Sequence, residues 1–98
     1  MALKIARLDE LYDGFRRVVR VNGLEVVLLP HKGEIVVFDA RCPHQEFSLA
    51  NGAIQGDSLI CPRHGLRFNL LTGQCLQNSS CLTRYHWYYE GNTICLAL

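Results

Sequence analysis

Short runs of apolar and β-branched residues, broken by glycine, proline and asparagine, recur along the chain. Runs of this length bounded by turn residues are typical of β-strands. We predict strands over 16–21, 24–29, 34–38, 59–60, 66–70, 82–89 and 93–98. A single helical turn is predicted over 8–11. The pattern therefore indicates an all-β domain, built as a small antiparallel β-sandwich or barrel.

Two dipeptides mark hairpin turns in this pattern. Asn22-Gly23 lies between the first two predicted strands, and Gly91-Asn92 lies between the last two. Both dipeptides tolerate the positive φ angles of a two-residue hairpin turn. Pro30 is expected in the connection that leads through Lys32-Gly33 to the strand at 34–38. His31, beside this turn, is expected to be exposed to solvent.

Size and charge narrow the classes of protein. The chain has 98 residues, enough for one small domain, and 49% of them are hydrophobic. A domain of this size buries a modest fraction of its surface, so a metal or a disulfide would help to stabilise it. Ten basic residues against nine acidic ones give a net charge of +1, which argues against a nucleic-acid partner. We interpret Arg16, Arg17 and Arg20, the densest basic run, as solvated charges.

The distribution of charge and cysteine predicts a cytoplasmic protein. The first ten residues carry charges throughout, and no segment has the roughly 20 apolar residues of a membrane span. Thiols stay reduced in the cytoplasm, so the five cysteines are not expected to form a disulfide framework. Cys75 and Cys81 are therefore expected to remain reduced, and Cys95 to be a small core residue. Metal binding is the first chemistry to consider.

The stretch 41–65 departs from the strand pattern and contains two Cys–His pairs. A long irregular excursion from a small β-domain is more often functional than idle. The pairs are C-P-H at 42–44 and C-P-R-H at 61–64, with sixteen residues between them. Two thiolates and two imidazoles suit zinc or an iron–sulfur centre. We predict that four side chains bind a metal cofactor: Cys42, His44, Cys61 and His64.

The order of these ligands distinguishes the two metals. Zinc fingers usually pair cysteine with cysteine in one knuckle and histidine with histidine in the other. Here each loop supplies one cysteine and one histidine. In a Rieske centre two cysteines hold one iron and two histidines hold the other. We therefore predict a Rieske-type [2Fe–2S] cluster, and a zinc site is the alternative.

The motif pair, its spacing and the surrounding strands resemble a Rieske ferredoxin. C-P-H-Q-E at 42–46, with Gly52 and Gly56 downstream, is similar to the ferredoxin component of toluene-type multicomponent monooxygenases. C-P-R-H-G-L-R-F-N at 61–69 is equally similar to ferredoxins of ring-hydroxylating dioxygenases. The resemblance implies a single Rieske domain over 1–98, a β-sandwich with a two-loop cluster-binding subdomain.

The resemblance also implies an electron carrier and not an enzyme. Single electrons would pass from an NADH-dependent flavin reductase to a terminal oxygenase of aromatic-compound oxidation, either a diiron monooxygenase or a Rieske dioxygenase. No Gly-rich nucleotide motif is present in the sequence, so the reductase would be a separate protein. We expect a monomer that docks its partners around His44 and His64, with no nucleic acid or membrane as partner. Two alternatives are the Rieske-like small subunit of a larger oxidoreductase, such as assimilatory nitrite reductase, and a zinc-stapled interaction module.

Departures from the high-potential Rieske proteins of respiratory chains imply a low reduction potential. In those proteins a disulfide joins the two loops, and serine and tyrosine hydroxyls donate hydrogen bonds to sulfur. Here Phe47 and Arg63 occupy the disulfide positions, and Leu66 and Phe68 occupy the hydroxyl positions. Hydrogen bonds to sulfur stabilise the more negative reduced cluster, so their loss lowers the potential. We expect a midpoint near the bottom of the Rieske range of roughly −150 to +300 mV.

Overall fold

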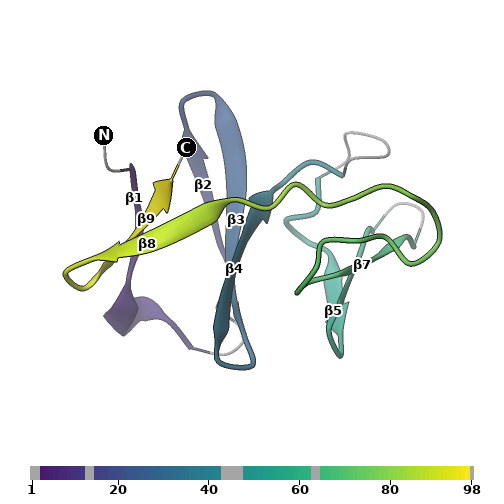
Figure 1. The fold of residues 1–98 in the computed structure, drawn as a ribbon, viewed down its shortest axis with the longest axis horizontal. Coiled ribbons are helices and arrows are strands. Elements are labelled where there is room, and N and C mark those ends of the chain that lie inside the picture. The colour runs from purple at the N-terminus through teal and green to yellow at the C-terminus, as the bar shows by residue number, and fades with distance from the viewer. Residues whose placement is uncertain (1–2, 13–14, 43–47, 63–64, 98) are drawn as a thin grey trace.

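Three antiparallel three-stranded sheets make up the computed structural model, which describes residues 3–12, 15–42, 48–62 and 65–97 (Figure 1). The first sheet has the order β1 (Leu3–Arg7), β9 (Thr93–Ala97) and β8 (His86–Glu90). The second has the order β2 (Arg17–Val21), β3 (Leu24–His31) and β4 (Glu34–Asp39). The third has the order β5 (Ala53–Gln55), β6 (Ser58–Ile60) and β7 (Arg67–Asn69). These sheets confirm the predicted all-β class.

Helical structure in these ranges is limited to the 3-10 turn η1 (Leu8–Glu10), close to the turn predicted at 8–11. No helix in the described part of the chain is long and apolar enough to cross a membrane. The connections between strands are therefore turns and irregular segments. The stretch 41–65, which was predicted to be mostly irregular, contains the two short strands β5 and β6.

The apolar runs of β3 and β4 arise because both faces of their sheet are buried. Successive residues of a strand point to opposite faces. Val26 and Leu28 pack on one side, and Val27 and Leu29 pack on the other. We call the first side the base core, which contains Ile5, Ala6, Val26, Leu28, Val37, Ile94 and Leu96. The second is the insert core, which contains Val27, Leu29, Val36, Phe38, Ala40, Cys42, Leu49, Leu59, Cys61, Phe68, Leu70, Cys75 and Leu82.

The chain between β4 and β8 forms an insert, residues 40–82, which carries the third sheet. Its two ends lie side by side, because the Asp39 N–H donates to the Thr83 carbonyl at 2.8 Å and the Tyr85 N–H donates to the Val37 carbonyl at 2.9 Å. Figure 1 shows the insert as a lobe next to β4, apart from the sheet of β1, β8 and β9. The first two sheets, which we call the base, support the insert through the insert core.

Most predicted strands are confirmed, with one shifted start and two omissions, β1 and β5. The Asn22-Gly23 turn has φ angles of 50° and 77°, as a hairpin of this kind requires. β8 begins at His86 and not at 82, because the preceding residues pair with β4 instead of β9. β1 was not predicted, since its five residues include two charges and carry a weak alternating pattern.

Pro30 lies inside β3 and is buried, so the prediction that it belongs to the following connection is wrong. It pairs with Ile35 of β4. The pairing of β2 with β3 ends at Leu28, so the β2 side of Pro30 has no strand partner. A proline is tolerated at such a position because its missing N–H leaves no ladder bond unmade.

Candidate metal centre

Cys42 and Cys61 both lie in the insert core, where their exposed fractions are 1% and 2%. Cys42 follows β4, and Cys61 follows β6 directly. Two strands from different sheets thus deliver one thiol each to the same packed region. The other two predicted ligands, His44 and His64, lie outside the described residues. The structure therefore places the two cysteines of the predicted set in the same packed core.

The segment that follows Cys42 is closed by backbone contacts at its base. Arg41 and Ser48 form an antiparallel bridge, and the Leu49 N–H donates to the Ala40 carbonyl at 2.6 Å. The Ser48 hydroxyl accepts a hydrogen bond from the Ala50 N–H at 3.2 Å. Cys42 is consequently the first residue inside a loop whose two ends are fixed to each other.

The segment that follows Cys61 is closed in a similar way. The Cys61 N–H donates to the Leu66 carbonyl at 2.8 Å, and the Gly65 N–H donates to the Cys61 carbonyl at 3.0 Å. Gly65 has φ +70°, a conformation that glycine adopts without steric cost. Each cysteine therefore begins a closed loop, and the sequence places one histidine in each loop.

The exit of the first loop is held by a side chain from the base. Nη1 of Arg16 donates to the Ala50 carbonyl oxygen at 2.6 Å and to the Gly52 carbonyl oxygen at 2.8 Å. Desolvation lowers the pKa of this half-buried guanidinium, which nevertheless stays charged. Our interpretation of Arg16 as a solvated charge is therefore wrong. No local pattern could have revealed these contacts, because the partners lie 34 and 36 residues away.

Gly52 allows the first loop to pack directly on β6. A Cβ at this position would lie 2.7 Å from the Ile60 carbonyl oxygen and 2.9 Å from Cδ1 of Leu59. Its φ is not in the positive range, so space and not backbone conformation selects glycine here. The close approach places the residues after the first loop against the strand that ends at Cys61.

A buried carboxylate, Asp39, lies at the entrance to the first loop. Its Oδ1 accepts a hydrogen bond from the Arg41 N–H at 2.9 Å, and its Oδ2 accepts one from the Tyr85 hydroxyl at 3.1 Å. Burial, and then the hydrogen bond to Asp39, raise the pKa of Tyr85, so this hydroxyl remains a donor at neutral pH. Neither residue was among our predicted site residues, and no motif singles them out.

The two positions where a hydroxyl donor was predicted to be missing are apolar and packed. Phe68 is fully buried in the insert core, and Leu66 is half-buried against the same core. Phe68 pairs with Leu59 of β6 and forms a bridge with Cys75. The side chains of Leu66 and Phe68 therefore offer no hydrogen-bond donor.

Side-chain contacts join the base to the insert just before β6, at the end of this strand opposite Cys61. Nε2 of His31 lies 2.9 Å from Oδ1 of Asp57, and Nζ of Lys32 lies 3.0 Å from the same oxygen. His31 is only 11% exposed, so the prediction of a solvent-exposed histidine is wrong. The end of β3 and the turn after it meet the turn of the β5–β6 hairpin here, which sequence spacing could not show.

The other three cysteines are not among the predicted ligands. Cys95 is fully buried in β9, which confirms it as a small core residue, and Cys75 is buried in the insert core. Sγ of Cys75 lies 3.5 Å from the side-chain oxygen of Gln77, and Cys81 is exposed. The described ranges include all five cysteines, and within them no disulfide forms.

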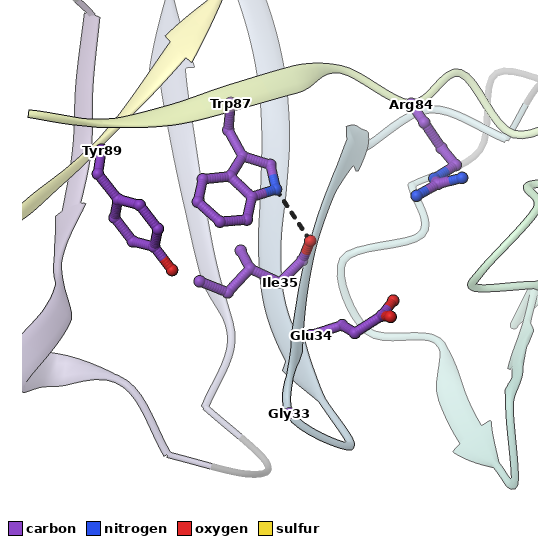
Figure 2. Close-up of a pocket in the computed structure, with 6 residues that line it drawn as sticks. All are labelled: Gly33, Glu34, Ile35, Arg84, Trp87 and Tyr89. Carbon is purple, nitrogen blue, oxygen red and sulfur yellow. Dashed lines mark hydrogen bonds between the residues drawn. The ribbon is translucent and has the colours of Figure 1, made fainter.

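The described surface also has a hollow of about 370 Å³ on the base, between β4 and β8 (Figure 2). It is lined by Gly33, Glu34, Ile35, Arg84, Trp87 and Tyr89. Nε1 of Trp87 donates to the Ile35 carbonyl at 3.0 Å, and the Trp87 and Tyr89 rings meet edge to face. Its lining residues in the described part of the chain include no cysteine or histidine, so it is distinct from the region around Cys42 and Cys61.

The donor set fits an iron–sulfur cluster better than a structural disulfide or an inert pair of core thiols. Both thiols are buried, and each is the first residue of a separate closed loop. The sequence adds one imidazole to each loop, which gives the two-cysteine, two-histidine set that a Rieske centre uses. The side-chain types of this set therefore match those of such a centre.

Comparison with known proteins extends this match beyond the motif. A family model described as a Rieske [2Fe-2S] domain matches residues 1–86. The ferredoxin component of the alkene monooxygenase system of Xanthobacter autotrophicus is 34% identical over 92 residues, which cover 92% of this chain and 75% of the relative. The ferredoxin component of the naphthalene 1,2-dioxygenase/salicylate 5-hydroxylase systems of Ralstonia sp is 37% identical over 71 residues, which cover 72% of this chain and 68% of the relative.

A solved structure shows the same architecture. The ferredoxin of carbazole 1,9a-dioxygenase from Nocardioides aromaticivorans IC177 superposes with a TM-score of 0.83 at 26% sequence identity. The match covers 98% of this chain and 96% of that ferredoxin. The base and the insert are thus both part of the shared fold.

Proposed function

This chain belongs to the family of Rieske [2Fe–2S] domains, and we propose that it is a ferredoxin that carries single electrons to a terminal oxygenase. Its cofactor is accordingly a Rieske-type [2Fe–2S] cluster. The observation that carries the proposal is the burial of Cys42 and Cys61 in one apolar core, each at the start of a closed loop. The ferredoxin relatives support it, because their similarity extends over most of the chain.

In this proposal Cys42 and Cys61 hold one iron, and His44 and His64 hold the other. When bound, the cluster accepts and releases one electron at a time. The insert core keeps water away from the two thiolates, and the closed loops fix their positions. A rigid, dry setting favours fast electron transfer, because little has to rearrange when the charge of the centre changes. The chain itself catalyses no bond chemistry.

The partners follow from the same proposal. A separate NADH-dependent flavin reductase supplies the electron, because the sequence holds no nucleotide-binding motif. The acceptor is an oxygenase of unsaturated or aromatic hydrocarbons, as the names of the relatives suggest. Encounters between electron-transfer proteins are small and transient, so the contact surface is expected to be confined to the residues around the ligands. These are Pro43, Gln45, Glu46, Pro62 and Arg63. We place the protein in the cytoplasm as a monomer.

Spectroscopy and metal analysis of one sample test the cofactor and its ligands together. The protein is purified without air, reduced with dithionite and examined by EPR, with iron and acid-labile sulfide assayed in parallel. We expect a rhombic signal of low average g and two irons and two sulfides per chain, the composition of a [2Fe–2S] cluster. Cys42→Ser and Cys61→Ser should each abolish the signal. Cys81→Ser, which changes an exposed cysteine, is the matched control and should retain it.

Two further results decide the proposal. Zinc at one ion per chain, with no iron uptake on reconstitution, would replace the electron carrier with a zinc-stapled module. A confirmed cluster that a flavin reductase and NADH cannot reduce would leave the cofactor in place and remove the proposed electron route. Reduction by the reductase, followed by reoxidation on addition of an oxygenase, is the expected outcome.

A further inference from the structure

We propose that Asp39 and Tyr85 form a positioning pair for Cys42, in which a buried carboxylate fixes the Ala40–Arg41 peptide group, one residue before this ligand, and thereby influences the electron affinity of the cluster. The inference rests on the proposed role of Cys42 as an iron ligand. Asp39 and Tyr85 touch neither the cofactor nor a partner in this account, and they act through the backbone and through charge.

Asp39 is unusual because it is a charged residue buried in the described structure, with 7% exposure. Burying a carboxylate is costly unless hydrogen bonds replace the lost water. Its oxygens receive the Arg41 N–H at 2.9 Å, the Tyr85 hydroxyl at 3.1 Å and Nε of Arg41 at 3.4 Å. A fully satisfied carboxylate of this kind rigidifies its surroundings.

The partner of Asp39 is itself fixed to the same strand. The Tyr85 N–H donates to the Val37 carbonyl at 2.9 Å, and the Asp39 N–H donates to the Thr83 carbonyl at 2.8 Å. The side-chain bond between Tyr85 and Asp39 therefore closes a ring whose other bonds are between backbone groups. This ring lies where the insert leaves and rejoins the base, so it ties both ends of the insert to β4.

The ring reaches Cys42 through three successive peptide groups. The Asp39 N–H is bound by Thr83, and the Ala40 N–H is bound by the Glu25 carbonyl at 2.9 Å. The third N–H, that of Arg41, is bound by the Asp39 carboxylate. Only this last bond, directly before Cys42, depends on a side chain. A change at Asp39 would therefore act on the Ala40–Arg41 peptide group, one residue before the ligand.

The negative charge of Asp39 is a second way in which the pair acts on the cluster. Asp39 lies three positions before Cys42, a backbone reach of at most roughly 10 Å. A buried charge at such a range is weakly screened. The reduced cluster is more negative than the oxidised one, so a fixed carboxylate disfavours reduction. The hydrogen bond from Tyr85 withdraws part of that charge. Removing the carboxylate and removing its donor should thus move the reduction potential in opposite directions.

The test compares Asp39→Asn and Tyr85→Phe with two controls in the full chain loaded with its cluster. Asp9→Asn removes an exposed carboxylate, and Tyr89→Phe removes an exposed hydroxyl in the neighbouring strand β8. The midpoint potential is measured by redox titration, and cluster loss is followed optically in the presence of an iron chelator. We expect a higher potential in Asp39→Asn and a lower one in Tyr85→Phe. Cluster loss should be about tenfold faster in both, the effect typical of changes behind a metal ligand.

The outcomes separate this inference from the proposed function. If wild type carries the cluster and both variants match their controls in potential and in cluster loss, the positioning role is wrong while the ferredoxin proposal stands. A loss of folding stability without a change of potential would also refute it, because a merely structural contact behaves in that way. If wild type itself takes up no [2Fe–2S] cluster, the proposed function fails and this inference fails with it. Should Asp39→Asn not fold, Tyr85→Phe decides alone, since it keeps the buried carboxylate and removes one hydroxyl.

Discussion

Nε2 of His31 lies 2.9 Å from Oδ1 of Asp57, and this contact links the base to the insert at the turn that precedes β6. The same turn is fixed from within the insert, because the Leu70 N–H donates to the Asp57 carbonyl at 2.8 Å. Asp57 therefore connects the β3–β4 hairpin with both β6 and the end of β7. It holds the strand that delivers Cys61 in place.

Replacing Asp57 with asparagine should loosen the insert while the base stays intact. Hydrogen bonds from His31 and Lys32 hold the pKa of Asp57 below its ordinary value of 3.8. Its contribution to stability is therefore present from neutral pH down to that value and is lost as the pH falls further. At pH 7 we expect faster hydrogen exchange at Leu70 in Asp57→Asn than in wild type. Glu34→Gln, which removes an exposed carboxylate in the β3–β4 hairpin, is the control and should leave this exchange rate unchanged.

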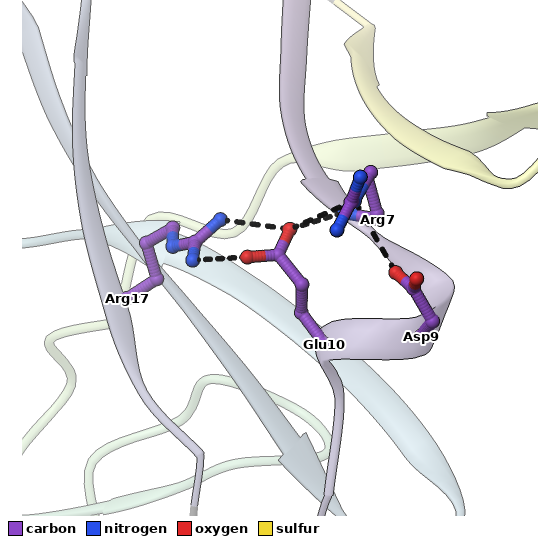
Figure 3. Close-up of polar contacts among 4 residues, drawn as sticks. All are labelled: Arg7, Asp9, Glu10 and Arg17. Atoms are coloured by element: carbon purple, nitrogen blue, oxygen red, sulfur yellow. Dashed lines mark hydrogen bonds and ion pairs between the residues drawn. The ribbon is translucent and has the colours of Figure 1, made fainter.

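Glu10 provides a measurable electrostatic contact in the base (Figure 3). Its carboxylate lies 2.5 Å from Nη2 of Arg17 and accepts the Arg7 N–H at 2.9 Å. The side-chain bond to Arg17, followed by the bond to Arg7, lowers the pKa of Glu10 from 4.5 to about 2. Because the folded pKa is depressed, this stabilisation is complete above pH 4.5 and disappears as the pH falls towards 2.

An NMR titration of the Glu10 carboxyl should show this shift directly. Arg17→Gln should move the midpoint upward towards 4.5, because it removes the largest cause. Arg7→Gln keeps the backbone N–H and should move it less. Equal midpoints in wild type and Arg17→Gln would show that the ion pair does not form in solution.

Gly52→Ala should destabilise the insert through a steric clash. The added methyl group would meet the Ile60 carbonyl oxygen at 2.7 Å, and a backbone atom cannot move away cheaply. Overpacking of this kind typically costs about 1–3 kcal/mol. We expect that loss in the free energy of unfolding and a reduced iron content, because the clash lies between the two loops. Gly23→Ala has no atom within 4 Å of its Cβ and a positive φ, so it should cost roughly 1 kcal/mol of strain and leave the iron content unchanged.

Hydroxyl donors introduced at the apolar positions beside the thiols should raise the reduction potential. Wild type is expected near the bottom of the Rieske range, roughly −150 to +300 mV. A hydrogen bond contributes about 1 kcal/mol, which corresponds to roughly 40 mV for a one-electron couple. Leu66→Ser and Phe68→Tyr should therefore each raise the midpoint by about this amount. Leu71→Ser, at an exposed leucine after β7, is the control. A wild-type midpoint above about +100 mV on that scale would contradict the argument.

Local pattern was enough to predict the frame of the molecule. The apolar runs of β3 and β4 and the Asn22-Gly23 turn are local signals, and the structure reproduces them. The two cysteines of the motif lie in one core, and their role as cluster ligands stays a prediction. Strand periodicity and turn chemistry act over a few residues, so a single sequence displays them.

The groups that hold the loops could not be found in this way. Arg16 donates hydrogen bonds to two carbonyl groups just after the first loop, and Tyr85 binds Asp39 across a separation of 46 residues. Both contacts depend on how the insert folds back on the base. An arginine in a basic run and a tyrosine in an aromatic run look ordinary in sequence. Tertiary packing gives them their partners, and Pro30 enters β3 for the same reason, because β2 ends before reaching it.

The adjacent ends of the insert make it a graftable unit. Residues 40–82 leave and rejoin the base between Asp39 and Thr83, which are joined by a backbone hydrogen bond of 2.8 Å. All six strands of the base lie outside this interval. A short connection across the junction would keep the base continuous, and an insert from a related ferredoxin could be exchanged without changing the sheet of β1, β8 and β9. Among the described residues, the base side chains that bond to the insert are those of Arg16, His31, Lys32, Asp39 and Arg84. These positions, with the base residues that line the insert core, would have to match the exchanged insert, while the rest of the base could stay unchanged.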